Sequence, residues 1–193
     1  MTKLNKLEEA VKKLYATKKP ERSEWVDWMV DNHVFVVADY ATDLANRFGA
    51  NTDLARAAAL LHDIADCNMS RMNPGHEAES LKMARELMIQ SGYTEEEVSL
   101  VVDDAIRYHS CYGGKSPDSI EGKILATADS KAHLKTGFYI HAAWALGKTI
   151  TLQQLKEWVL EKIERDLNDK VFFDEVREEL RPDYEIIKNL FSR

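Results

Sequence analysis

The sequence predicts an all-α fold, and three observations support this prediction. The 193-residue chain contains only 8 Gly and 4 Pro, so few positions interrupt regular structure. Apolar residues recur at three- and four-residue steps in almost every segment, which is the spacing of one helix face. No segment shows a strong alternation of apolar and polar residues, the pattern of a half-buried strand. We expect a single domain over residues 1–193, because a chain of this length can enclose one core.

The composition is that of a soluble globular protein, with 45% hydrophobic and 31% charged residues. The net charge of −7 gives no electrostatic basis for binding a nucleic acid polymer. There is no signal-peptide pattern and no apolar run of about 20 residues, so we expect a cytoplasmic protein that does not bind membranes. Cys67 and Cys111 are too few for a disulfide framework, and we interpret both as small buried or partly exposed thiols.

The first half of the chain is expected to form four helices, over residues 3–18, 23–49, 53–66 and 76–91. Pro20 ends the first helix, because a residue before proline is displaced from the helical conformation. Ser23 caps the second helix, and Asn51 or Thr52 caps the third. Gly92 stops the fourth.

The second half is expected to form a helix over 95–109, a helix beginning at Asp118 or Ser119, and a helix over 152–169. Thr94 opens the first of these with a capping box. One or two closing helices follow on either side of Pro182. Residues 110–117 form a loop, which is either an active-site lid or a plain connector. We assign no chemistry to the region after residue 137, which is interpreted as packing and a surface for a homodimer.

Six residues of metal-binding type lie at helix ends or on apolar faces, roughly one position per successive helix: His33, His62, Asp63, His76, His109 and Asp129. Each histidine taken alone is explained as a core or surface residue. Asp129 is harder to explain, because it ends the apolar run 124–128 and a buried carboxylate without a partner is costly. His133 lies four residues later, where it could orient or pair with Asp129.

As a set, these residues favour a metal centre. Neutral imidazoles and carboxylates together suit Zn, Mn, Fe, Co or Ni. No CxxC motif is present, and ligands that come from several helices are typical of a catalytic ion with open positions rather than a closed structural site.

The pattern His33, then His62-Asp63, then Asp129 resembles the HD-domain superfamily of metal-dependent phosphohydrolases. The resemblance implies an HD-domain-like bundle over about residues 25–135, with a C-terminal helical extension over about 137–193. His76 and His109 resemble the additional histidines of members that hold two ions, where Asp63 would bridge them. The GYP signature of cyclic-dinucleotide phosphodiesterases is absent.

This resemblance implies hydrolysis of a nucleotide or another phosphate ester by a water that one or two divalent ions activate. The ions would be Mn, Fe, Co, Ni, Zn or Mg. Asp63 and Asp66 are the candidate catalytic residues, and Asp66 is either a proton acceptor, an orienting residue or a solvated turn residue. The candidate phosphate contacts are Arg71, Lys115, Lys131 and Lys135.

Three alternatives remain on the sequence alone. An HD-like diiron oxygenase would use a similar ligand set for a different reaction. A non-catalytic regulator that binds a metal or a nucleotide would keep the ligands without turnover. A purely structural helical protein would explain the periodicity, but not the apolar surroundings of Asp129.

Overall fold

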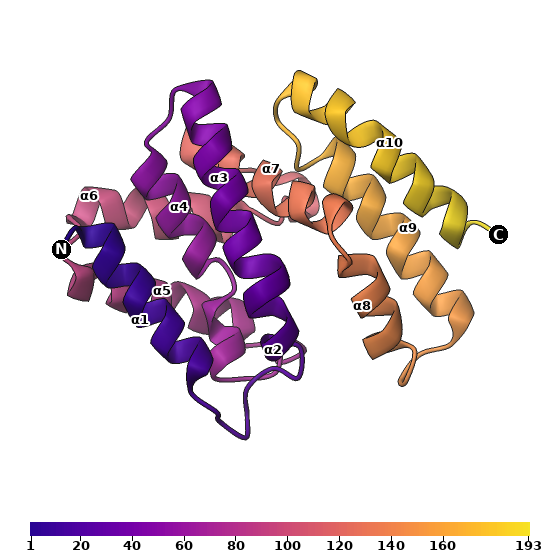
Figure 1. Ribbon diagram of the computed structural model, residues 1–193, viewed down its shortest axis with the longest axis horizontal. Helices are drawn as coiled ribbons and strands as arrows, with labels where there is room; N and C mark the ends of the chain where they lie inside the picture. Colours follow the sequence, from indigo (N-terminus) through magenta and orange to yellow (C-terminus); the bar gives the residue numbers. More distant parts are fainter.

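The computed structural model describes residues 1–193 and confirms the all-helical prediction (Figure 1). The elements, in chain order, are α1 (Lys3–Ala16), α2 (Val26–Met29), the π-helix η1 (Val30–Val34), α3 (Phe35–Phe48), α4 (Thr52–Leu61), the 3-10 helix η2 (Ile64–Cys67), α5 (His76–Ser91), α6 (Glu95–Val98), the π-helix η3 (Ser99–Ile106), the 3-10 helix η4 (Tyr112–Gly114), α7 (Ile120–Lys135), α8 (Phe138–Leu146), α9 (Leu152–Asn168) and α10 (Asp174–Phe191).

Helix α7 lies between the two halves of the molecule. It packs against α3, α4 and η3 on one side and against α8, α9 and α10 on the other. In Figure 1, α8, α9 and α10 form a separate flank, in orange and yellow, beside the earlier helices. One contiguous cluster of buried apolar side chains nevertheless extends from Leu7 in α1 to Tyr184 in α10.

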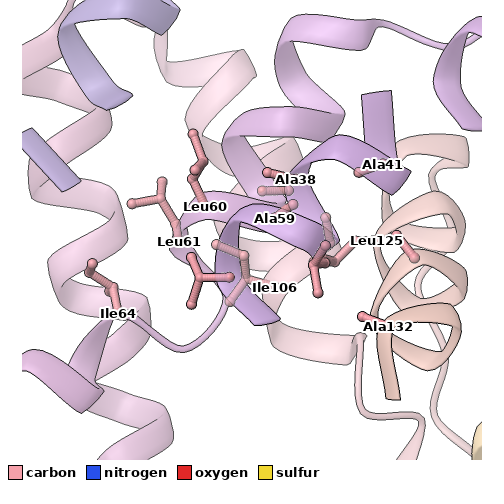
Figure 2. Packing of buried hydrophobic residues seen from close by; sticks show 14 of the residues in the cluster. Ala38, Ala41, Ala59, Leu60, Leu61, Ile64, Ile106, Leu125 and Ala132 are labelled. Carbon is pink, nitrogen blue, oxygen red and sulfur yellow. The ribbon is translucent and has the colours of Figure 1, made fainter. Parts of the chain in front are cut away.

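Small side chains allow α3, α4 and α7 to approach one another closely. Ala38 and Ala41 on α3, Ala59 on α4 and Ala132 on α7 are all completely buried, and Figure 2 shows them with Leu125 and its apolar neighbours. An alanine occupies little volume, so the backbones of neighbouring helices can come near without leaving voids. This packing brings together the three parts of the chain that carry His33, His62 and Asp129.

Two predicted α-helices contain π-helical turns. The expected helix over 23–49 is α2, η1 and α3 in succession, and the one over 95–109 includes η3. A three- and four-residue pattern cannot reveal a single wider turn, because the apolar face continues on both sides of it. Such turns are frequent at functional sites, and His33 lies within η1.

The third predicted helix ends earlier than expected. Helix α4 ends at Leu61 rather than at Asp66, because Asp63 has φ −124° and ψ 31°, outside the helical region. The chain then continues as η2. Asn51 caps α4 and Ser119 caps α7, and both caps had been among the predicted alternatives.

The prediction that Ser23 caps the second helix is wrong, because α2 begins at Val26 after Trp25 and no side chain caps it. Helix α8 was not predicted. The other boundaries agree closely with the sequence or choose between its alternatives. The capping box at Thr94 is present. The closing segment is one helix, α10, which contains Pro182 on its exposed side. Cys67 and Cys111 are both free and buried, as predicted. None of the helices has the length and apolar character needed to cross a membrane.

Candidate metal centre

Three of the predicted ligands converge at one point inside the molecule. His33, His62 and Asp129 each offer one ligand atom, and the three atoms lie within 4.8 Å of one another. His33 Nε2 is 3.3 Å from His62 Nε2 and 3.1 Å from Asp129 Oδ1. The three residues are at most 3% exposed. We refer to them as the HHD centre.

The break after α4 directs the His62 ring into this centre. His62 Nδ1 lies 2.7 Å from the carbonyl oxygen of Ala59, so Nδ1–H donates to that oxygen. In a neutral imidazole the other nitrogen then carries a lone pair. Nε2 of His62 therefore faces His33 and Asp129 as a potential ligand.

The HHD centre has the donor set that a divalent ion requires. Burial lowers the pKa of His33, although Asp129 opposes this effect, so its ring is neutral near pH 7. Burial also acts to raise the pKa of Asp129, but His133 and Lys170 outweigh it and hold the pKa well below its usual range. His33 Nδ1 is buried and has no hydrogen-bond partner. Two imidazole nitrogens and a carboxylate oxygen within 4.8 Å of one another suit a divalent metal ion.

Asp63 lies at the edge of the HHD centre. Its Oδ2 is 3.4 Å from His62 Nε2 and 2.8 Å from Arg71 Nη1. The pKa of Asp63 is held well below its usual range, because Arg71 and the neighbouring histidines outweigh the effect of burial. The non-helical backbone at Asp63 allows two adjacent side chains to approach the same region, which a regular helix would prevent.

Asp66 is completely buried, so the interpretation as a solvated turn residue is wrong. Its Oδ1 accepts a hydrogen bond from His76 Nε2 at 2.9 Å, and its Oδ2 binds the guanidinium of Arg71. Burial acts against the charge of Arg71, but Asp63 and Asp66 raise its pKa above the ordinary value. His76 therefore contacts Asp66 and is not among the three converging ligands.

His109 borders the centre from the end of η3. Its Nδ1 lies 2.6 Å from the carbonyl oxygen of Ile106, so Nδ1–H donates there and Nε2 is free of its proton. Its ring centroid is 5.4 Å from that of His62. Burial and the proximity of His62 lower the pKa of His109 to about 4, so this imidazole is neutral near pH 7.

The predicted phosphate contacts differ in their relation to the centre. Arg71 is part of the site through Asp63 and Asp66. Lys115 is exposed in the loop after η4, and Lys131 Nζ lies 4.6 Å from the centroid of the Tyr40 ring. Neither lysine forms an ion pair with the HHD centre. Lys135 pairs with Asp183 at the end of α7.

The region after residue 137, to which the sequence analysis assigned no chemistry, contributes side chains that contact the centre. Lys170 forms an ion pair with Asp129 Oδ2, and Asp166 Oδ2 lies 3.0 Å from His133 Nδ1. His133 Nε2 is 3.3 Å from Asp129 Oδ1, so the sequence correctly linked these two residues. A signal for the others was available, because Asp166 on α9 and Lys170 just beyond its end continue the three- and four-residue spacing of Val159 and Ile163.

Comparison with known proteins agrees with this geometry. The family model described as HD domain matches residues 30–134, more than half of the chain. Among curated proteins, none matches the chain significantly in sequence. The crystal structure of selenomethionine-labelled YpgQ from Bacillus subtilis is similar in fold, with a TM-score of 0.64, 19% identity, and coverage of 99% of this chain and 95% of that one. The chain therefore belongs to the HD-domain family, which binds divalent metal ions and falls within the metal-dependent phosphohydrolase superfamily.

Proposed function

We propose that this protein is a metal-dependent phosphohydrolase that cleaves a nucleotide or another small phosphate ester. The observation that carries the proposal is the convergence of His33 Nε2, His62 Nε2 and Asp129 Oδ1 within 4.8 Å. Two imidazole nitrogens that face each other at 3.3 Å beside a carboxylate are stable only with a proton or a cation among them. We assign these three residues as the primary metal ligands.

A divalent ion bound there would lower the pKa of a water ligand and polarise a phosphoryl oxygen. The protein contributes groups that are already fixed. The carbonyl oxygen of Ala59 sets the tautomer and orientation of His62, and Lys170 holds the second oxygen of Asp129. Groups that need no rearrangement during the reaction stabilise developing charge more effectively than groups that must first be ordered.

Asp63 is the carboxylate we assign to the reacting water. It lies beside His62, and its side chain is 15% exposed, so it can reach both the ligand set and the solvent. Asp66 is assigned a positioning role, because His76 and Arg71 already bind its two oxygens. His109, whose Nε2 lies 3.4 Å from Ser110 Oγ, is assigned to the substrate side of the centre or to a second, weaker ion.

We propose that Arg71 contacts a substrate phosphate. Of the candidate phosphate contacts, it is the one that lies beside the metal centre. Its side chain is 31% exposed, and its guanidinium already spans Asp63 and Asp66. A guanidinium can bind a phosphate with two parallel hydrogen bonds. Lys115 and Lys131 are proposed as more distant contacts with a phosphate chain, and they would act through long-range attraction.

The decisive experiment combines metal content with hydrolysis. Protein prepared without chelator is analysed by elemental mass spectrometry and then assayed for phosphate release from nucleoside mono-, di- and triphosphates and from p-nitrophenyl phosphate. We expect about one tightly bound divalent ion and hydrolysis that depends on it. Asp63→Ala should abolish the hydrolysis, whereas Asp53→Ala, at an exposed position in the first turn of the preceding helix α4, should not.

Two results would contradict the proposal. Absence of bound metal under every loading condition would favour a regulatory or structural protein. Bound iron with oxygen consumption and no phosphate release would favour an oxygenase. Close to two equivalents of metal, with hydrolysis, would instead add His76 and His109 to the ligand set.

A further inference from the structure

The C-terminal part of the chain, after α7, contributes charged side chains to the interior of the molecule, where the metal centre lies. Lys170 is 3% exposed and Asp166 is completely buried, and both reach α7 from α9 and the segment that follows it. Charged side chains are rarely buried to this extent unless they are paired. These residues lie outside the part of the chain, 30–134, that matches the HD-domain family model.

The two carboxylate oxygens of Asp129 have different partners. Lys170 Nζ binds Oδ2. Oδ1 lies 3.1 Å from His33 Nε2 and 3.9 Å from His62 Nε2. An ammonium group has only hydrogen-bond donors, so it competes for a carboxylate oxygen and cannot itself ligate a cation. Lys170 therefore occupies one oxygen of Asp129 and leaves the other directed at the histidines.

The backbone that carries Lys170 is fixed without its side chain. Thr127, two residues before Asp129 on α7, donates its Oγ1 hydrogen to the carbonyl oxygen of Lys170 at 3.2 Å. The same Oγ1 accepts a hydrogen bond from the backbone N–H of Phe172 at 3.2 Å. Thr127 and Val171 are both buried. A change of the Lys170 side chain is therefore expected to leave the path of the chain intact.

We propose that Lys170 is a positioning residue of the metal centre, whose ammonium group holds Asp129 as a one-oxygen ligand with Oδ1 presented to the ion. This inference rests on the metal centre of the proposed function. His133 Nε2 lies 3.3 Å from Oδ1, so His133 contacts the oxygen that the ion would share, not the oxygen that Lys170 holds. Without Lys170, Asp129 is free to rotate away or to bind with both oxygens.

The test measures metal binding in Lys170→Met, with Lys170→Arg as the rescue variant. Lys135→Met is the matched control, because Lys135, at the C-terminal end of α7, also pairs with an aspartate of another element, namely Asp183 on α10. The readouts are the Mn²⁺ dissociation constant from calorimetry, the visible absorption spectrum of the Co²⁺-loaded protein, and the thermal unfolding of the metal-free protein.

We expect Lys170→Met to bind Mn²⁺ about 10–100-fold more weakly, the usual effect of losing a group that holds a metal ligand. Its Co²⁺ spectrum should change, because the coordination by Asp129 changes. Lys170→Arg should recover part of the affinity, since a guanidinium also donates to a carboxylate. Lys135→Met should match the unmodified protein in its Mn²⁺ dissociation constant and its Co²⁺ spectrum.

The proposal is overturned if Lys170→Met keeps the original Mn²⁺ affinity and Co²⁺ spectrum and shows only a lower unfolding temperature, because Lys170 would then be a structural pair alone. If Lys170→Met does not fold, Lys170→Gln is measured. Its neutral amide can still donate to Oδ2, so we expect a smaller loss of Mn²⁺ affinity, and an unchanged affinity and Co²⁺ spectrum overturn the proposal. A protein that binds no Mn²⁺ overturns both this inference and the proposed function. A protein that binds Mn²⁺ but releases no phosphate overturns the proposed function only, since the affinities still test Lys170.

Discussion

Two neighbouring groups of acidic and histidine side chains differ in where the protein places its own cation. In the HHD centre, Lys170 lies behind Asp129 on Oδ2, and Oδ1 and two imidazole nitrogens remain directed at one point. In the second group, Arg71 bridges Asp63 and Asp66, and His76 binds the remaining oxygen of Asp66. In the second group, protein donors therefore bind both oxygens of Asp66, whereas in the HHD centre the protein cation binds only Oδ2 of Asp129.

This difference explains why similar residue types need not have equal metal affinity. A carboxylate whose oxygens are already hydrogen-bonded must lose those bonds before it can bind an ion. Asp129 Oδ1 needs no such exchange with a fixed protein cation. We therefore expect one ion of high affinity at the HHD centre, and the predictions below test that contrast.

The largest effect is expected for Asp129→Asn, which removes the charged ligand with little change in shape. Tightly bound metal should be lost, and phosphate release should fall by more than about 100-fold, beyond the usual effect of losing an outer partner of a ligand. Elemental mass spectrometry and the phosphate assay measure both. Asp183→Asn, which disrupts the ion pair with Lys135, is the control. Full metal occupancy in Asp129→Asn would show that the HHD centre is assigned incorrectly.

A large increase in metal content is expected for Arg71→Met, which removes the cation that bridges Asp63 and Asp66. Asp63 and Asp66 would then lack their balancing charge, so metal content should rise from about one equivalent toward two. Removing one partner of a buried ion pair costs about 3–5 kcal/mol, and the partial exposure of Arg71 reduces this figure. The metal-free variant should therefore unfold at a lower temperature. An unchanged metal content would mean that Arg71 does not limit a second ion.

A moderate effect of pH on the metal-free protein follows from the lowered histidine pKa values. Burial lowers the pKa of His133 to about 3, and burial with His62 lowers that of His109 to about 4. The unfolded chain gains these protons near pH 6.5, before the folded protein does, so the free energy of unfolding should decrease as the pH falls from about 6.5 to about 4. Thermal unfolding across this range measures the decrease.

The metal should oppose this decrease, because an ion bound to neutral imidazoles stabilises the folded state. With saturating Mn²⁺, the unfolding temperature should therefore exceed that of the metal-free protein, by most near pH 7 and by less as protons compete for the ligands. Identical pH profiles with and without Mn²⁺ would contradict a metal centre at these histidines.

The smallest effect is expected for Lys115→Ala at the exposed loop. An exposed charge pair contributes about 0.2–1 kcal/mol, so KM should rise by less than about fivefold with little change in kcat. Lys12→Ala is the control. It also removes a surface lysine, one that pairs with Glu8 on α1 and lies far from the loop in sequence. A decrease in kcat of tenfold or more for Lys115→Ala would place this lysine much closer to the reacting phosphate than we propose.

The sequence was sufficient for the fold class and for the core of the candidate site. Helical periodicity predicted the helices, and the order of His33, His62, Asp63 and Asp129 indicated the superfamily before any geometry was known. The unusual position of Asp129 after an apolar run correctly indicated a buried carboxylate, and Lys170 and histidine side chains lie beside it. Local pattern carries this information because each helix must direct one apolar face toward the core.

Only the tertiary structure decided how the charges are paired. The wider turn at His33, the end of α4 at Leu61, and the contacts of Lys170 and Arg71 depend on packing between segments far apart in the chain. An isolated sequence pattern cannot distinguish an exposed lysine from one that reaches a carboxylate 41 residues away. The sequence thus determined the helices and the candidate ligand types, whereas packing determined which cation lies beside each buried carboxylate, because a buried charge without a partner is costly.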